Sequence, residues 1–117
     1  MSAAAASVRR ETLLWVAQRA SAAILAICVV VHLAVIIYAV RGGLSAAEIL
    51  ARTRGSAAWL GFYLLFVTAV TIHAPIGLRT MLREWTPWRG PSLDIFAVAA
   101  ALVLALMGVR AALAVFA

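Results

Sequence analysis

Three long runs of apolar residues dominate the chain, and two short polar stretches separate them. The runs cover residues 20–40, 57–78 and 95–117. Each is close to the ~20 residues that an α-helix needs to cross the ~30 Å hydrocarbon core of a bilayer. The first run is longer than the roughly 7–15 apolar residues of a signal peptide. All three runs are therefore predicted to be spanning helices.

The pattern predicts an all-α integral membrane protein with three transmembrane helices, at about residues 13–40, 57–85 and 94–117. The first helix extends back through Leu13 and Trp15, and the second continues to Trp85. The third is entered through a turn in which Ser92 or Asp94 can cap the helix. Because no segment is left over for a soluble domain, residues 1–117 are predicted to form one membrane domain.

The stretch between the first two runs carries its own helix signals. Gly42 and Gly43 are predicted to end the first helix. Ser45 and Glu48 have the spacing of a capping box, in which each residue's side chain accepts from the other's backbone N–H. We therefore predict one short amphipathic helix, lying in the membrane interface between the first and second spans.

Composition supports a lipid environment. Hydrophobic residues make up 67% of the chain and charged residues only 12%. A soluble domain of this size cannot bury so much apolar surface. The net charge of +6 comes from arginine alone, and most arginines flank the apolar runs. We interpret this charge as a determinant of membrane orientation and predict no nucleic-acid partner.

Arginine is distributed unequally between the two predicted sides of the membrane. The loop at residues 41–56 holds three arginines, whereas the N-terminus and residues 79–89 share the other side. That side holds six, namely Arg9, Arg10, Arg19, Arg79, Arg83 and Arg89. The positive-inside rule then places the N-terminus inside.

Two histidines, His32 and His73, lie within the predicted spans. An ionisable residue inside the bilayer is a candidate functional residue. A neutral imidazole can ligate b-type haem through one ring nitrogen. It can equally serve as a hydrogen-bonding contact between packed helices, so both interpretations stay open for each histidine.

His73 is followed by residues that suit a bound macrocycle. Gly77 lies one turn on, on the same helix face, where a missing side chain lets a flat group approach the backbone. Arg79 and Arg83 follow at the membrane boundary, where guanidinium groups can pair with carboxylates such as haem propionates. Ordinary snorkelling of arginine to the interface is the alternative.

The segment from His73 to Trp85, HAPIGLRTMLREW, resembles the H-x-x-x-G-[IL]-R stretch of the cytochrome b membrane anchor subunits of succinate dehydrogenase and fumarate reductase. The resemblance implies that His73 is an axial ligand of haem b, and that Arg79 is the arginine of the motif. Thr80 stands where some members carry a second histidine.

The segment from Trp15 to Ser21, WVAQRAS, resembles the S-x-x-H-R-x-[ST] entrance to the family's first helix. The resemblance implies a quinone pocket near Arg19 and Ser21, with Trp15 beside it. Trp15 replaces the family's serine and Gln18 its histidine, so the quinone contacts here differ from the pattern.

His32 is present in the first helix, as in the di-haem members of the family and unlike the single-haem ones. At 1.5 Å per residue, His73 lies about 9 Å from Arg79 on the inner side and His32 about 13 Å from Arg41 on the outer side. The two imidazoles are therefore predicted to serve two stacked haems. Since the chain has only two histidines, a partner subunit must supply the other axial ligands.

The resemblance implies a haem b-binding anchor subunit of succinate:quinone oxidoreductase, the respiratory complex II of the tricarboxylic acid cycle, in a bacterial inner membrane. It would pass electrons from a flavoprotein and an iron–sulfur subunit to quinone, and the site of succinate chemistry would lie outside this chain. A non-redox anchor and a small transporter component with structural histidines remain alternatives. Arg110, inside the third run, either snorkels outward or meets an outer haem propionate.

Overall fold

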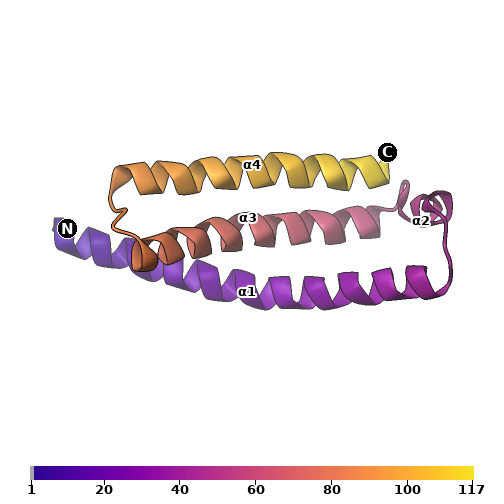
Figure 1. Ribbon diagram of the computed structural model, residues 1–117, viewed down its shortest axis with the longest axis horizontal. Coiled ribbons are helices and arrows are strands. Elements are labelled where there is room, and N and C mark those ends of the chain that lie inside the picture. The colour runs from indigo at the N-terminus through magenta and orange to yellow at the C-terminus, as the bar shows by residue number, and fades with distance from the viewer. Residues whose placement is uncertain (1) are drawn as a thin grey trace.

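The computed structural model describes residues 2–117 as four helices. They are α1 (Ala3–Arg41), α2 (Ala46–Thr53), α3 (Ala57–Trp85) and α4 (Pro91–Phe116) (Figure 1). The three long helices α1, α3 and α4 are long and apolar enough to cross a membrane. The predicted fold class is confirmed, including the short helix between the first and second spans.

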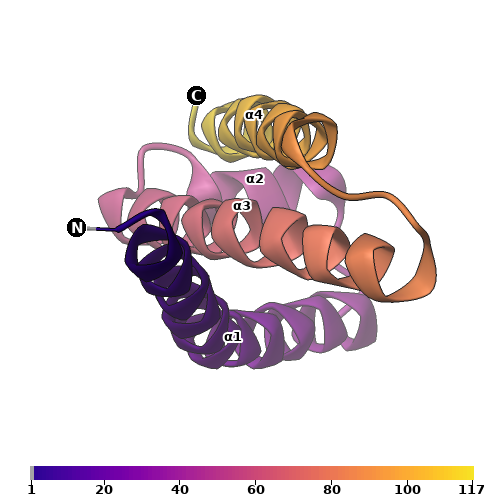
Figure 2. The same ribbon diagram turned by 90° about the vertical axis from the view of Figure 1, so that its left-hand side faces the viewer.

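The long helices form a layer in which α3 lies between α1 and α4 (Figures 1 and 2). At one end the N-terminal part of α1 reaches the beginning of α4, where Arg10 lies 3.6 Å from Asp94. Only 6% of the most apolar stretch of each long helix is buried. The remaining apolar surface is therefore left to contact lipid or another subunit.

Local sequence signals explain where α1 and α2 begin and end. α1 begins already at Ala3, because the Ser2 hydroxyl accepts from the backbone N–H of Ala5 at 3.2 Å and caps the alanine-rich start. Gly43 has φ +63, a left-handed conformation that favours glycine, directly after α1 ends. In α2 both hydrogen bonds of the Ser45–Glu48 capping box are present, as predicted.

The start of α4 differs from the prediction. Gly90, with φ +88, precedes Pro91, which takes the first helical position. Neither Ser92 nor Asp94 caps the helix, because both already lie inside it. The Ser92 hydroxyl instead accepts from the Trp88 indole N–H at 2.8 Å, and Asp94 binds an arginine of α3.

At the other end of the layer the α2–α3 connection holds the end of α4. The last carbonyls of a helix have no partner within the helix. Here three consecutive residues donate to them: Thr53 Oγ1 to Val115 at 2.8 Å, Gly55 N to Phe116 at 2.9 Å and Arg54 Nε to Ala117 at 3.1 Å. We call this end the α2 end, and the opposite end, with residues 9–11 and 79–94, the charged end.

Close packing between α3 and α4 depends on Gly108. A Cβ added at this position would lie 2.6 Å from Cγ1 of Val67. The missing side chain lets the two helices approach in the half of α4 that lies toward the α2 end. Small residues serve the same purpose in many membrane helix pairs.

Candidate functional site

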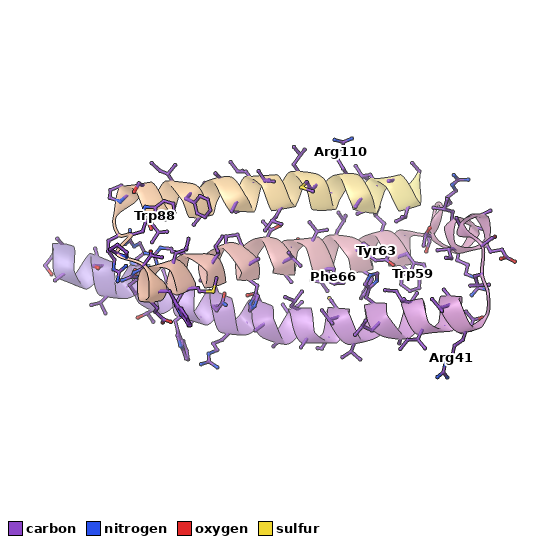
Figure 3. The ribbon with its side chains drawn as sticks, viewed as in Figure 1. Arg41, Trp59, Tyr63, Phe66, Trp88 and Arg110 are labelled. Carbon is purple, nitrogen blue, oxygen red and sulfur yellow. The ribbon has the colours of Figure 1, made fainter. Side chains whose placement is uncertain are left out.

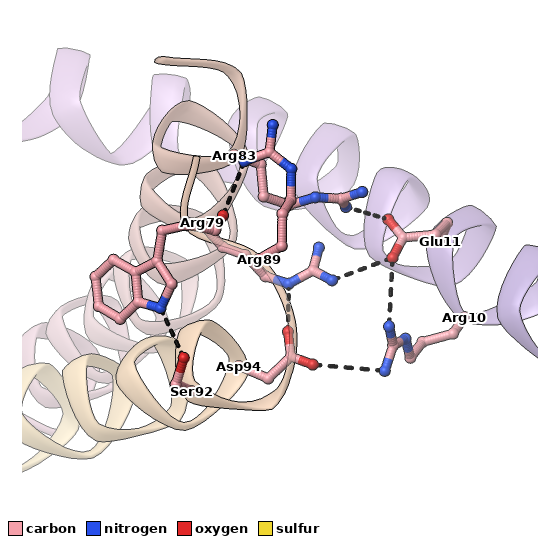
Figure 4. Close-up of polar contacts among 8 residues, drawn as sticks. Arg10, Glu11, Arg79, Arg83, Arg89, Ser92 and Asp94 are labelled. Atoms are coloured by element: carbon pink, nitrogen blue, oxygen red, sulfur yellow. Dashed lines mark hydrogen bonds and ion pairs between the residues drawn. The ribbon is translucent and has the colours of Figure 1, made fainter. Parts of the chain in front are cut away.

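Arg79 lies at the centre of a charged cluster that joins the three long helices (Figure 4). Its side chain comes from α3 and is 9% exposed. Its Nε donates to Asp94 Oδ1 of α4 at 2.7 Å, and its Nη2 donates to Glu11 Oε1 of α1 at 3.1 Å. A guanidinium so buried needs carboxylate partners, and the two carboxylates supply them.

Two further arginines complete the cluster. Arg83 Nη1 donates to Glu11 Oε2 at 3.3 Å, and Arg10 lies 3.6 Å from Asp94 and 3.7 Å from Glu11. The Arg83 side chain is 41% exposed. Of the two arginines predicted to meet haem propionates, Arg83 therefore has the more accessible guanidinium, whereas Arg79 is engaged within the chain.

A cavity of about 710 Å³ opens between α1 and α3 at the charged end, and we call it the His73 cavity. It brings together most of the residues predicted from the sequence for haem or quinone. Those residues are Trp15, Arg19, His73, Gly77, Arg79 and Arg83. The predicted haem residues other than His32, and two of the predicted quinone residues, thus share one cavity.

Trp15 and Arg19 lie one turn apart on α1, with the Arg19 guanidinium 5.3 Å from the centre of the Trp15 ring. Both are exposed to the surroundings of the chain. Ser21 does not line the cavity. It is 4% exposed, and its hydroxyl donates to the Gln18 carbonyl at 3.1 Å.

His73 approaches the cavity from α3, and its Nδ1 atom is buried without a hydrogen-bond partner. One turn on, the space beside Gly77 is taken by Gln18 of α1, whose Nε2 lies 3.2 Å from where a glycine-replacing Cβ would be. Gln18 Oε1 is also buried without a partner. The space beside Gly77 that the sequence predicts for a flat group is thus occupied by a polar side chain of α1.

His32 lies in a second cavity, of about 500 Å³, nearer the α2 end, which we call the His32 cavity. Its ring meets Tyr63 and Phe66 edge-on, with centroid distances of 5.9 and 5.6 Å. Figure 3 shows both aromatic side chains on α3. His32 Nδ1 is likewise buried without a partner. The two histidines therefore lie in different cavities.

The side chains of each cavity suit a cofactor in which most of the metal's ligands belong to the cofactor itself. In residues 2–117 no three His, Cys, Asp or Glu side chains come together to hold a metal ion. A bare transition-metal ion usually needs three or four protein ligands. Haem iron needs only axial ligands from the protein, so one imidazole per cavity fits half of a haem site.

Arg110 lies on the exposed flank of α4 and points away from the other helices (Figure 3). No ion pair joins it to residues 2–117. The two predictions for this arginine, snorkelling and contact with an outer propionate, both stay predictions.

Gln18, Glu11 and Asp94 were not predicted as site residues from the sequence. A usable signal existed for the two acids. Three of the four acidic residues of the chain, Glu11, Glu84 and Asp94, fall at the same end as six arginines. Gln18 carried no such signal, because only the approach of α1 to Gly77 brings its amide into the cavity.

Comparison with known families matches residues 3–108 to the family described as "Succinate dehydrogenase/Fumarate reductase transmembrane subunit". The match spans α1, α2, α3 and most of α4, and it includes both histidines. No curated protein and no solved structure matches the chain significantly.

Proposed function

Because the chain belongs to the family of succinate dehydrogenase/fumarate reductase transmembrane subunits, we propose that it binds b-type haem through His73 and supports electron transfer to quinone. As a member of that family it is a transmembrane anchor subunit and assembles with other subunits of the complex. The finer proposal concerns the cofactor and the residues that hold it.

The observation that carries this proposal is the setting of His73. Its imidazole borders a cavity that is open on the flank of α1 and α3, where a second subunit can pack. Arginine side chains line the cavity toward the charged end. An imidazole with cations at one edge of its cavity matches the needs of a haem with propionates.

Each residue would have a distinct task. His73 would provide one axial nitrogen, and Arg83 would pair with a propionate at the edge of the cavity. Gly77 would admit the edge of the haem once Gln18, which occupies the space beside this glycine, turns away. Haem, when bound, supplies a one-electron carrier whose potential the protein tunes by ligation and burial. The second axial histidine would come from the partner anchor subunit.

The quinone contacts are proposed at the mouth of the same cavity. Arg19 can donate to a quinone carbonyl oxygen, and the Trp15 ring below it offers an apolar face. Ser21 would act on this pocket only indirectly, through the hydrogen bond that its buried hydroxyl donates to the Gln18 carbonyl. The iron–sulfur and flavoprotein subunits would dock at the charged end, on the inner side of the membrane.

His32 is proposed as the axial ligand of a second haem, nearer the α2 end. Its separate, largely apolar cavity supports this assignment. The edge-on aromatic rings around it also suit a histidine used for packing. The two interpretations differ in the haem content of the assembled complex.

The proposal is tested on the whole complex, purified through one of its soluble subunits so that the anchor need not be tagged. A reduced-minus-oxidised spectrum is expected to show the α band of b-type haem in the wild type. His73→Ala should lose the haem of its cavity, and added imidazole should restore part of the absorbance. Met81→Leu, in the same cavity, serves as the matched control and should keep it.

A wild-type complex without haem absorbance would contradict the proposal and favour the non-redox anchor. So would a His73→Ala complex whose spectrum and haem content equal those of the wild type. His73→Gln separates ligation from packing, because an amide can replace a hydrogen bond between helices but is a poor iron ligand.

A further inference from the structure

Four buried side-chain atoms lack a hydrogen-bond partner within residues 2–117: Gln18 Oε1, His32 Nδ1, Thr71 Oγ1 and His73 Nδ1. His32 and Thr71 line cavities of their own, whereas Gln18 and His73 line the same one. An amide oxygen only accepts hydrogen bonds, and an imidazole nitrogen donates when it carries the proton. The two unpaired atoms of the His73 cavity are therefore complementary.

The fold brings Gln18 close to His73 through Gly77. Gly77 lies one helical turn after His73, about 6 Å along the α3 axis. The Nε2 atom of the Gln18 amide lies 3.2 Å from the position that a Cβ at residue 77 would occupy. Because the glutamine side chain has three rotatable bonds, its amide can turn from this gap toward the imidazole.

Other acceptors in the cavity are less suitable. Glu11 is bound by Arg79 and Arg83. Glu84 follows His73 at a separation of about 16 Å along the same helix, and Thr80 at about 10 Å. Gln18 is thus the acceptor that α1 offers to His73.

We propose that Gln18 is the positioning residue of His73. Its Oε1 accepts the Nδ1–H of His73 once the glutamine side chain turns toward the imidazole. The proton is then held on Nδ1, and the lone pair of Nε2 is free to ligate iron. This tautomer control is the role of outer partners at many metal-bound histidines. The inference rests on the proposed haem site at His73.

The test uses the intact complex with three substitutions. Gln18→Met keeps the side-chain length and neutrality but removes the acceptor. It should weaken haem affinity by about tenfold or more and raise the haem midpoint potential, because the imidazole becomes a poorer electron donor. Gln18→Glu keeps an acceptor and should retain haem. Thr80→Val, a polar change in the same cavity, should alter neither property.

The outcomes separate this inference from the proposed function. If Gln18→Met keeps wild-type affinity and potential while His73→Ala loses haem, the positioning role is wrong and the haem site stands. If the wild-type complex holds no haem, the proposed function itself fails. Gln18→Leu provides a second variant without an acceptor should Gln18→Met not assemble, and equal potentials for Gln18→Leu and the wild type would overturn the role.

Discussion

The charged end and the α2 end of the molecule each place a histidine in a cavity, but in very different surroundings. The His73 cavity lies between α1 and α3, whereas the His32 cavity is lined mainly by α3 and α4. At the charged end His73 shares its cavity with arginines and with the amide of Gln18. At the α2 end His32 meets the edges of Tyr63 and Phe66 in a cavity that is almost entirely apolar. Both imidazoles keep an unpaired Nδ1.

The two ends are also held together differently. Side-chain ion pairs around Arg79 join α1, α3 and α4 at the charged end. At the α2 end, the helices are held together by hydrogen bonds to backbone carbonyls and by the close approach of α3 and α4 at Gly108. The comparison teaches that charge is concentrated where propionates, quinone and soluble subunits are proposed to bind. At the α2 end, backbone capping and close packing join the helices of residues 2–117 without ion pairs between their side chains.

The largest stability effect is expected from Arg79→Leu, which removes the centre of the cluster. Glu11 and Asp94 would lose their closest cation. We expect the free energy of unfolding to fall by about 2–3 kcal/mol. This is less than for fully buried ion pairs, because both carboxylates are partly exposed. Arg83→Leu is the control and should cost about 0.5 kcal/mol. Denaturation of the purified subunit in mixed micelles measures both, and equal losses would contradict the central place of Arg79.

Gly108→Ala tests the packing at the other end. The new Cβ would meet Val67, and overpacking of this kind costs about 1–3 kcal/mol. Adding Val67→Ala should recover most of the loss. Gly61→Ala is the matched helix substitution, since nothing lies within 4 Å of its added Cβ, and it should be neutral or stabilising. A Gly108→Ala variant as stable as Gly61→Ala would show that the helices do not approach closely here.

Thr53→Val tests the hold of the α2–α3 connection on α4. It removes the donor to the Val115 carbonyl while keeping the shape of the side chain, so we expect a loss of about 1 kcal/mol. Thr12→Val removes a comparable bond, from Thr12 to Val8 within the exposed start of α1, and should cost less. The same denaturation assay compares the stability losses of the two variants. A larger loss for Thr12→Val would argue against the stabilising role of the Thr53–Val115 hydrogen bond.

The smallest effect is expected at Glu48. Hydrogen bonds from Ser45 lower the pKa of this exposed carboxyl below its ordinary value of 4.5. A lowered pKa in the folded state means that the stabilisation is present above the ordinary value and is lost as the pH falls through the folded one. Glu48→Ala should therefore be less stable than the wild type at pH 7, and the difference in stability should shrink as the pH falls below 4.5. A difference that does not change with pH would contradict the capping role.

Features decided by short stretches of sequence were predictable. The three spans follow from run length, and the end of α1 and the start of α2 follow from Gly43 and the Ser45–Glu48 spacing. The start of α4 was predicted wrongly, because Pro91 begins the helix before either expected cap.

The partners of Arg79 depend on tertiary structure and could not be read from local patterns. Glu11 and Asp94 are far from Arg79 in the chain and meet it only because α1 and α4 approach α3 at the same end. Gln18 was noted only as a departure from the family pattern, and its place beside Gly77 comes from the packing of α1 on α3.

The central claim, that the charged end carries the haem site of this subunit, is tested most directly by counting haem per complex. Wild type, His73→Ala and His32→Ala are compared after purification through a soluble subunit, with protein and haem quantified in the same sample. His73→Ala is expected to remove the haem of the charged end, and His32→Ala only the second haem proposed for the α2 end. Unchanged haem in the His73→Ala complex would contradict the claim.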